Sequence, residues 1–313
     1  MMEHLSDKES RLLLVRGLRD ELRKNLLGPY FITNPSEFSF SDHDPDEKEI
    51  LGLNKDEGQK LLAMSIQRLS GLQELLYANS SKSLLIVLQA MDAGGKDGTI
   101  KHVMSGINPQ GVSVVSFKQP SKNELARSFL WRVNLHLPAK GRIGIFNRSH
   151  YEDVLISRVH PEMLKKERVL MTEPDEAFWN GRYEDICNFE KHLVRSDTVV
   201  LKFFLHISKK EQKKRFLQRL EDDTKLWKFS LADMQERQYW DSYQTAYEEM
   251  IIKTSTSFAP WVVVPADRKW FARLVVIESI IQALLAMNLS PPTPAPEVIA
   301  SLKKIREDLL HED

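Results

Sequence analysis

The chain has 313 residues, which is long enough for one or two domains with a large hydrophobic core. Lys and Arg together number 44, as do Asp and Glu, so the overall charge points to neither a nucleic acid nor a membrane surface as a partner. The single cysteine, Cys187, excludes a disulfide framework or a thiolate metal cluster within one chain.

The N-terminal part, residues 1–57, is expected to be a helix followed by an irregular arm. Residues 10–26 have an amphipathic helical pattern, and residues 28–49 are rich in turn formers and acids. The first residues are charged throughout and lack the apolar segment of a signal peptide. No stretch is long and apolar enough to span a bilayer, so we expect a cytoplasmic protein without membrane contact.

The middle of the chain alternates between helical patterns and short apolar runs. Residues 58–78 carry apolar side chains at helical spacing, and five apolar runs follow. These runs are too continuous for half-exposed strands, so they predict a parallel sheet with helices on both faces, which is an α/β fold. The predicted strands are residues 84–89, 112–117, 143–147, 199–205 and 261–265.

Residues 58–290 are expected to form the core, with a helical lid inserted between the fourth and fifth strands. The lid covers about residues 208–252, where two helical patterns flank a turn and basic residues are frequent. Residues 268–289 predict a last core helix, and residues 291–313 a Pro-rich spacer with a C-terminal helix. The apolar stripe of that helix either docks on the chain's own core or, as the second choice, contacts another subunit of a homo-oligomer. The stripe consists of Val298, Leu302, Ile305 and Leu309.

The sequence LQAMDAGGKDGT, residues 88–99, follows the first predicted strand and is close to the phosphate-loop pattern G-x-x-x-x-G-K-[ST]. Glycines allow the backbone to approach a phosphate closely, and the start of the next helix binds anions. Two positions depart from the pattern, because Ala90 replaces the first glycine and Asp97 replaces the hydroxyl residue. Asp92 is then a substitute ligand for a hard cation. The alternative is a sharp turn with a surface lysine. The expected phosphate contacts are Gly94, Gly95, Lys96, Asp97, Gly98 and Thr99.

A second dense stretch, GRIGIFNRSHYEDVLISRVHPE, covers residues 141–162. It begins as a buried strand and then places polar residues at the strand's C-terminal end, where ligands bind in open parallel sheets. We therefore expect it to meet the phosphate loop in one crevice. Arg148 offers a planar fork for phosphate. Glu152 and Asp153 could hold metal, orient a hydroxyl, or pair with Arg148 and Arg158.

These stretches, together with FKQPSKNELARSFLWR and KKRFLQRLEDDTKLWKFSLADMQER, resemble the family 2 polyphosphate kinases over roughly residues 35–290. The form NRSHYEDVL, with Asn147 in place of aspartate, is similar to the class III subgroup, which phosphorylates both AMP and ADP. The resemblance implies a P-loop kinase-like core and reversible phosphoryl transfer between inorganic polyphosphate and adenine nucleotides (AMP, ADP, ATP). It also implies dependence on Mg²⁺, with Mn²⁺ as a possible substitute.

The resemblance also implies roles for individual residues. Asp92 and Asn147 are the expected metal ligands, although a neutral amide at 147 weakens one magnesium contact. The expected catalytic residues are Asp92, Lys96, Arg148 and Glu152. Because polyphosphate carries about one negative charge per phosphate, a local basic channel is needed. Its expected members are Lys118, Arg148, Lys214, Arg215, Arg219, Lys225 and Lys228. The expected nucleotide contacts are Asn123, Arg127, Trp131, Asn147, His150, Tyr151, Glu152 and Asp153.

Two other functions are compatible with part of this pattern. An ATP-dependent nucleotide or small-molecule kinase needs the same loop and lid, but it more often keeps Ser or Thr after the lysine, where this chain has Asp97. A non-catalytic polyphosphate-binding protein has no need of an acid such as Asp92 near Lys96. Binding to nucleic acid is not expected, because the sequence has no basic stripe with interleaved aromatic residues.

Overall fold

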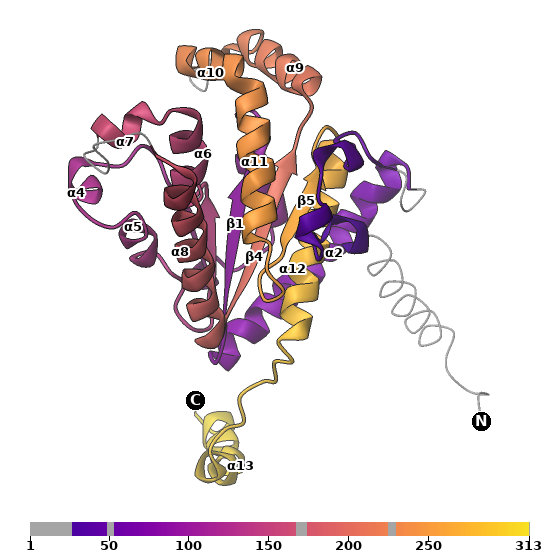
Figure 1. Ribbon diagram of the computed structural model, residues 1–313. Helices are drawn as coiled ribbons and strands as arrows, with labels where there is room; N and C mark the ends of the chain where they lie inside the picture. Colours follow the sequence, from indigo (N-terminus) through magenta and orange to yellow (C-terminus); the bar gives the residue numbers. More distant parts are fainter. Residues whose placement is uncertain (1–26, 49–52, 167–173, 225–229, 313) are drawn as a thin grey trace.

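The computed structural model describes residues 27–48, 53–166, 174–224 and 230–312 (Figure 1). A five-stranded parallel sheet with the order β2-β3-β1-β4-β5 lies at its centre. All five predicted strands are present within one residue of their expected ends, and the predicted α/β class is confirmed. The strands are β1 (Ser83–Gln89), β2 (Val112–Ser116), β3 (Ile143–Asn147), β4 (Thr198–His206) and β5 (Trp261–Pro265).

The burial of each strand follows its place in the sheet. Every residue of β1, β3 and β5 is buried, as continuous apolar runs in a covered parallel sheet predict. The expectation of full burial is wrong for β2, where Ser113 and Ser116 are exposed and Val114 is 50% exposed. β2 is an edge strand with a partner on one side only, so its side chains meet solvent more readily.

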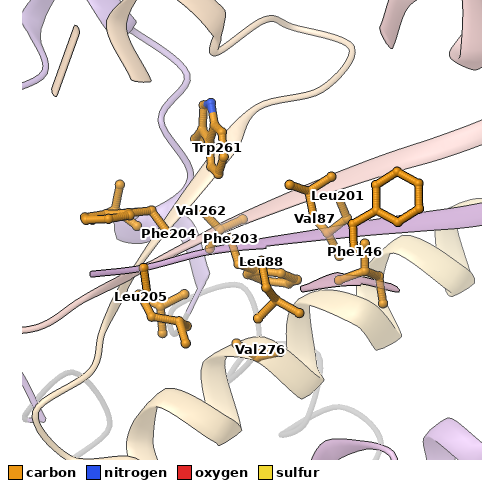
Figure 2. Close-up of a cluster of buried hydrophobic side chains, with 14 of the residues drawn as sticks. Val87, Leu88, Phe146, Leu201, Phe203, Phe204, Leu205, Trp261, Val262 and Val276 are labelled. Atoms are coloured by element: carbon orange, nitrogen blue, oxygen red, sulfur yellow. The ribbon is translucent and has the colours of Figure 1, made fainter. Parts of the chain in front are cut away.

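Helices pack in two layers on opposite faces of the sheet. Figure 2 shows Leu88 and Leu205 on the side of Val276, whereas Trp261 lies on the other side. On that second side, the ring of Phe204 lies 4.5 Å from the ring of Tyr247, measured between centroids. One layer contains α2 (Lys55–Asn79), α3 (Lys96–Val103) and α12 (Lys269–Ala286), and the other contains α6 (Glu152–Val159), α8 (Glu176–Arg195) and α11 (Trp240–Thr254). The short helices α4 (Lys122–Leu125), α5 (Trp131–Asn134) and α7 (Glu162–Lys166) lie in the connections.

The described part of the N-terminal arm, residues 27–48, covers the outer edge of β5. The N–H of Ile32 donates to the carbonyl of Trp261 at 2.9 Å, and Phe31 forms an isolated bridge with Val262. Tyr30 and Phe38 are buried in the same core as the sheet. The arm is irregular, as predicted, and it shields a sheet edge that would otherwise expose unpaired backbone groups. The helix predicted over residues 10–26 lies outside the described residues.

The predicted lid is shorter than expected. α9 (Lys209–Leu220) and α10 (Leu231–Glu236) stand beyond the C-terminal ends of the strands (Figure 1). α11, however, buries Trp240, Tyr247 and Met250 and packs against α6 and α8. This helix therefore belongs to the core layer, because its apolar face is needed to cover the sheet, and only α9 and α10 remain as a lid.

The C-terminal helix α13 (Pro296–Leu310) stands apart from the core (Figure 1). The first expectation for its apolar stripe, docking on the chain's own core, is wrong, because Val298, Leu302, Ile305 and Leu309 are 44–61% exposed. The Pro-rich residues 290–296 lead the chain away from the end of α12 instead of folding it back. Among the helices that the structure describes, none is both long and apolar enough to cross a membrane.

A pair of matched substitutions tests this difference between helices. Ile277 of α12 is fully buried, whereas Ile305 of α13 is 46% exposed. We expect Ile277→Ala to lower the free energy of unfolding by about 2–5 kcal/mol, because it leaves a cavity. We expect Ile305→Ala to change it by less than about 0.5 kcal/mol. Urea denaturation at low protein concentration measures both, and an equally large loss at Ile305 would show that α13 docks on the core.

Candidate active site

The phosphate-loop sequence forms a tight connection between β1 and α3. Gly95 caps α3 with φ of 102°, a left-handed conformation that favours glycine. Gly94 is required for a different reason, since a Cβ there would lie 2.6 Å from the Cβ of Ala90 and 2.8 Å from the carbonyl oxygen of Met91. The loop thus brings the N-terminus of α3, with its free N–H groups, to the C-terminal edge of the sheet.

Lys96 is the first residue of α3 and folds back over the loop. Its Nζ donates to the carbonyl of Ala90 at 2.7 Å. Burial lowers the pKa of Lys96 to about 8, and the nearby charge of Arg148 acts in the same direction. A solvated surface lysine would not experience this environment, so the structure favours the phosphate-loop interpretation over a simple turn.

Arg148 joins the two motifs found in the sequence. Its Nη2 donates to Oδ1 of Asp92 at 2.8 Å, and its Nη1 donates to Oε2 of Glu152 at 3.2 Å. The charge of Glu152 raises the pKa of Arg148, so the guanidinium stays protonated. Arg148 has φ of 62°, which is strained for a residue with a side chain. The predicted meeting of the loop and the strand-end motif in one crevice is confirmed.

Asp97, which departs from the phosphate-loop pattern, contacts Asn147, which replaces aspartate in the strand-end motif. Nδ2 of Asn147 donates to Oδ1 of Asp97 at 2.6 Å. An aspartate at position 147 would bring two carboxylates to hydrogen-bond distance, which is unfavourable unless a proton or cation lies between them. Asn147 therefore suits a loop that carries Asp97 in place of Ser or Thr.

The loop opens into a polar cavity of about 1100 Å³. Basic residues from five parts of the chain line it, and two of them, Lys269 and Arg273, were not among the predicted phosphate contacts. Partial burial and the charge of Arg215 lower the pKa of both. Crowded cations of this kind indicate an anion site. A signal was present, because Lys269 and Arg273 are one helical turn apart immediately after β5. The basic lining residues are Lys96, Lys118, Arg148, Arg215, Arg219, Lys269 and Arg273.

Arg215 lines the cavity but directs its nitrogens mainly at the protein backbone. Nη1 donates to the carbonyls of Ala93 and Gly94, each at 3.0 Å, and Nε donates to Oε1 of Glu211 at 3.0 Å. Nη2 donates to the carbonyl of Ala266 after β5. Only 5% of Arg215 is exposed. The side chain thus connects the phosphate loop to the end of β5, a role that its sequence position did not indicate.

The other predicted lid cations are placed differently. Arg219 lines the cavity, with Nη1 3.9 Å from Oδ2 of Asp233 on α10. Lys214 is paired with Glu211 at 3.2 Å and does not line the cavity. Lys225 and Lys228 lie outside the described residues. On α9, the sequence reasoning missed Gln212, whose Nε2 donates to the carbonyl of Asp92 at 2.9 Å.

Among the predicted nucleotide contacts, His150 and Tyr151 are fully buried beneath the cavity. They point into the layer between β4 and α8, so the structure gives them a supporting environment rather than a surface for a base. Burial also lowers the pKa of His150. Asp153 lies 3.7 Å from Arg182, measured between Oδ1 and Nη1.

Asn123, Arg127 and Trp131 lie on and next to α4 and α5, outside the cavity lining. The guanidinium of Arg127 covers the ring of Trp131 at 4.4 Å from its centroid. A base that stacked on this face of Trp131 would have to displace Arg127. These three residues therefore form a separate group on the rim of the site.

The acids of the site suit magnesium better than a metal held by protein alone. In the parts of the chain that are described, no group of three or more His, Cys, Asp or Glu side chains is arranged to hold a metal ion. Magnesium usually needs only one or two carboxylates, with substrate phosphates and waters as its other ligands. Asp92 fits this requirement, because one of its oxygens contacts Arg148 and the cavity is next to it. Asp233 faces the same space, and burial together with the charge of Asp92 raises its pKa.

Two conservative substitutions separate the roles of the α9 arginines. We expect Arg215→Lys to lower the free energy of unfolding by about 2–3 kcal/mol. A lysine cannot donate hydrogen bonds to all three buried carbonyls, those of Ala93, Gly94 and Ala266, to which the guanidinium donates. The matched Arg219→Lys keeps a charge at a partly exposed ion pair and should change stability by less than about 0.5 kcal/mol. Chemical denaturation of both variants tests this, and equal losses would contradict the structural role of Arg215.

Comparison with known proteins identifies the family. A model of the family described as polyphosphate kinase 2 (PPK2) matches residues 52–291. The chain is 50% identical over 258 residues to an ADP-polyphosphate phosphotransferase of Rhodopseudomonas palustris, covering 82% of this chain and 89% of that protein. It is 45% identical over 272 residues to an AMP/ADP-polyphosphate phosphotransferase of Meiothermus ruber, covering 86% and 98%.

The structure leads to the same family. A crystal structure of polyphosphate kinase 2 from Arthrobacter aurescens TC1 superposes with a TM-score of 0.80 and 41% identity, over 88% of this chain and 98% of that one. The residues that the family model matches, 52–291, contain the phosphate loop, the strand-end motif, α9 and α10. The chain therefore belongs to the polyphosphate kinase 2 family.

Proposed function

We propose that this protein transfers a phosphoryl group from inorganic polyphosphate to AMP and ADP, giving ADP and ATP, and that the reaction is reversible. The observation that carries the proposal is the cavity at the phosphate loop, where cations from α3, α9, α12 and the segments that follow β2 and β3 converge with the acid Asp92. A chain of phosphates needs more positive charge than one nucleotide does, and the extra charge of Lys269 and Arg273 meets that need. We place the reaction in the cytoplasm, where adenine nucleotides are available.

The chemistry requires positioning and neutralisation of charge rather than covalent help from the protein. Lys96 and Arg148 carry the charges that contact the transferring phosphoryl group, and the N–H groups at the start of α3 bind its oxygens. Asp92 and the side-chain oxygen of Asn147 would hold Mg²⁺, or Mn²⁺ in its place. The metal, when bound, neutralises charge on the phosphates and aligns them.

The second carboxylate next to Arg148 has a supporting function in this proposal. Glu152 contacts one arm of the guanidinium while Asp92 contacts the other, so Arg148 keeps its orientation when Asp92 binds metal. The lid helix α9 lies over the loop and excludes water from the reacting phosphates, which protects them from hydrolysis. Lys118 and Arg219 extend the basic lining on either side of the loop.

The acceptor is proposed to enter from the side of α4 and α5. Asn123, Arg127 and Trp131 lie there. The amide of Asn123 and, once Arg127 is displaced, the ring of Trp131 are suited to a base. The similar proteins differ in acceptor, since the Rhodopseudomonas relative is an ADP-polyphosphate phosphotransferase and the Meiothermus relative an AMP/ADP-polyphosphate phosphotransferase. The motif that contains Asn147 resembles that of the class III subgroup, so it supports the use of both AMP and ADP as acceptors.

We also propose that the protein is a homo-oligomer and that the exposed stripe of α13 contacts another copy. The apolar side chains of this helix are exposed in the single chain, and burying them would be favourable. Light scattering that gives the mass of one chain at micromolar concentration would contradict this assembly.

The reaction is tested with purified protein, Mg²⁺ and long-chain polyphosphate, with nucleotides separated by chromatography. With AMP as acceptor we expect ADP and then ATP, and with ADP we expect ATP at once. Conversion of ADP alone would restrict the acceptor to ADP. Product that forms only when ATP replaces polyphosphate as donor would instead establish the ATP-dependent kinase, and binding without any product would leave a polyphosphate-binding protein.

Two matched substitutions of aspartate test the site within that assay. We expect Asp92→Asn to lower kcat by about 10²–10³-fold, because the carboxylate that holds the metal is lost. Asp185→Asn changes an exposed carboxylate of α8 that lies outside the cavity, so turnover should stay within about twofold of the wild type. Near-normal turnover of Asp92→Asn would contradict its metal role.

The pKa of Lys96 predicts a dependence on pH. The ammonium must be protonated to contact phosphate, and its pKa is lowered to about 8, so kcat/KM for polyphosphate should fall as pH rises above that value. The slope should approach about tenfold per pH unit. In Lys96→Arg the guanidinium stays protonated, so this alkaline decline should disappear even if the rate is lower. An unchanged decline in Lys96→Arg would assign the titration to another group.

A further inference from the structure

A cluster of buried polar side chains lies directly beneath the strand-end motif. Lys202 of β4 donates from Nζ to Oε2 of Glu190 on α8 at 2.6 Å and to the hydroxyl oxygen of Tyr151 at 3.0 Å. The hydroxyl of Tyr151 in turn donates to Oε1 of Glu190 at 2.7 Å. Lys202, Glu190 and Tyr151 are all fully buried. The three side chains therefore form a closed triangle of hydrogen bonds in the interior.

Stability alone does not explain this cluster. Lys202 interrupts the apolar strand VVLKFFL, whose neighbouring residues Leu201 and Phe203 are buried in the core. The removal of two charges from water costs several kcal/mol per ion, and a buried ion pair is often replaceable by apolar residues without loss of stability. A buried polar cluster can instead hold one arrangement of the backbone, provided that its members satisfy each other.

The backbone that this cluster contacts is the turn that carries Arg148. Tyr151 follows Arg148 by three residues and precedes α6, whose N-terminus has no side-chain cap. Within the turn, the N–H of Tyr151 donates to Oγ of Ser149 at 3.2 Å. Arg148 is in the left-handed region, with φ of 62°, and such strain persists only where surrounding contacts hold it. Two side chains of this turn reach the buried pair. The hydroxyl of Tyr151 hydrogen-bonds to both of its members, and Nε2 of His150 lies 3.6 Å from Oε1 of Glu190.

The opposite side of the cluster is fixed to the core. Nζ of Lys202 also donates to the carbonyl of Thr254 at the end of α11, at 2.8 Å. Thr254 accepts at its hydroxyl from Nε1 of Trp261 on β5, at 2.9 Å. The Lys202–Glu190 pair is therefore connected to β4, α8, α11 and β5. It presents Nζ of Lys202 as a donor and Oε1 of Glu190 as an acceptor to the hydroxyl of Tyr151.

We infer that Lys202 and Glu190 are positioning residues for the phosphotransferase reaction. They act through the hydroxyl of Tyr151 to hold the β3–α6 turn, so that the guanidinium of Arg148 lies between Asp92 and Glu152. The inference rests on the proposed function, since it concerns the placement of a group that contacts the transferring phosphate. It assigns the buried Tyr151 to support of the site, in place of the nucleotide contact expected from the sequence.

Tyr151→Phe is the most direct test, because it removes one hydroxyl and leaves the aromatic ring and the Lys202–Glu190 contact. We expect kcat to fall about tenfold, as misplacement of a catalytic group predicts, while KM for polyphosphate changes less than about twofold. The control is Tyr183→Phe, which removes the hydroxyl of another buried tyrosine, one that is not among the described hydrogen-bond partners of Lys202 or Glu190. Its kcat should equal that of the wild type.

A double-mutant cycle with Arg148→Ala distinguishes positioning from a general structural effect. If Tyr151 acts through Arg148, then Tyr151→Phe causes no further loss of kcat in the Arg148→Ala background. Losses that multiply would overturn the inference, as would a Tyr151→Phe variant that melts earlier but keeps the wild-type kcat. Lys202→Met with Glu190→Leu removes both charges together, and it should keep the fold and show the same reduced kcat.

A crystal structure of Tyr151→Phe separates this inference from the proposed function. Arg148 displaced from Asp92 or Glu152 supports the positioning role whatever the activity of the wild type. Arg148 at wild-type distances from both carboxylates overturns it, even if polyphosphate proves to be the donor. A wild-type protein that makes no product from polyphosphate would contradict the proposed function alone.

Discussion

The contact of Arg148 with two carboxylates is the constraint on which the site depends. Asp92 belongs to the phosphate loop and lies 56 residues before Arg148, while Glu152 lies one helical turn after it. One guanidinium thus ties the connection after β1 to the connection after β3. The two strands are neighbours in the sheet, which places their C-terminal ends side by side. The strained backbone of Arg148 and the buried cluster of Lys202, Glu190 and Tyr151 beneath it hold the guanidinium in this position.

Around that contact, the structure collects positive charge that the overall composition conceals. The chain has equal numbers of basic and acidic residues, yet seven basic side chains of its described part line one cavity. Arg215 uses its guanidinium to hold the loop and the end of β5 together, and its charge also lowers the pKa of Lys269 and Arg273. Such crowding is unfavourable without an anion and becomes favourable when phosphates bind, so the protein is preorganised for a polyanion.

The departures of the loop from the common phosphate-loop pattern are explained by their neighbours. Asp97 replaces a hydroxyl residue and accepts a hydrogen bond from Asn147, which is itself a departure in the second motif. Asp92 adds a carboxylate beside the loop, which is the type of ligand that we propose for magnesium. Two motifs that look degenerate when read separately therefore complement each other across the sheet.

The sequence by itself determined the five strands, the phosphate loop and the meeting of both motifs, because hydrophobic period, glycine placement and the parallel-sheet rule are local or topological signals. The tertiary structure alone decided which side chains face the cavity. The position of Tyr151 at the end of the third strand suggested that it contacts a nucleotide, but the turn after β3 directs it into the core, where it contacts Lys202 and Glu190. Arg215 and Arg219 are one helical turn apart and both line the cavity, yet the buried Arg215 donates to backbone carbonyls whereas the partly exposed Arg219 lies near Asp233. Such outcomes depend on contacts between residues far apart in sequence, and no local pattern encodes them.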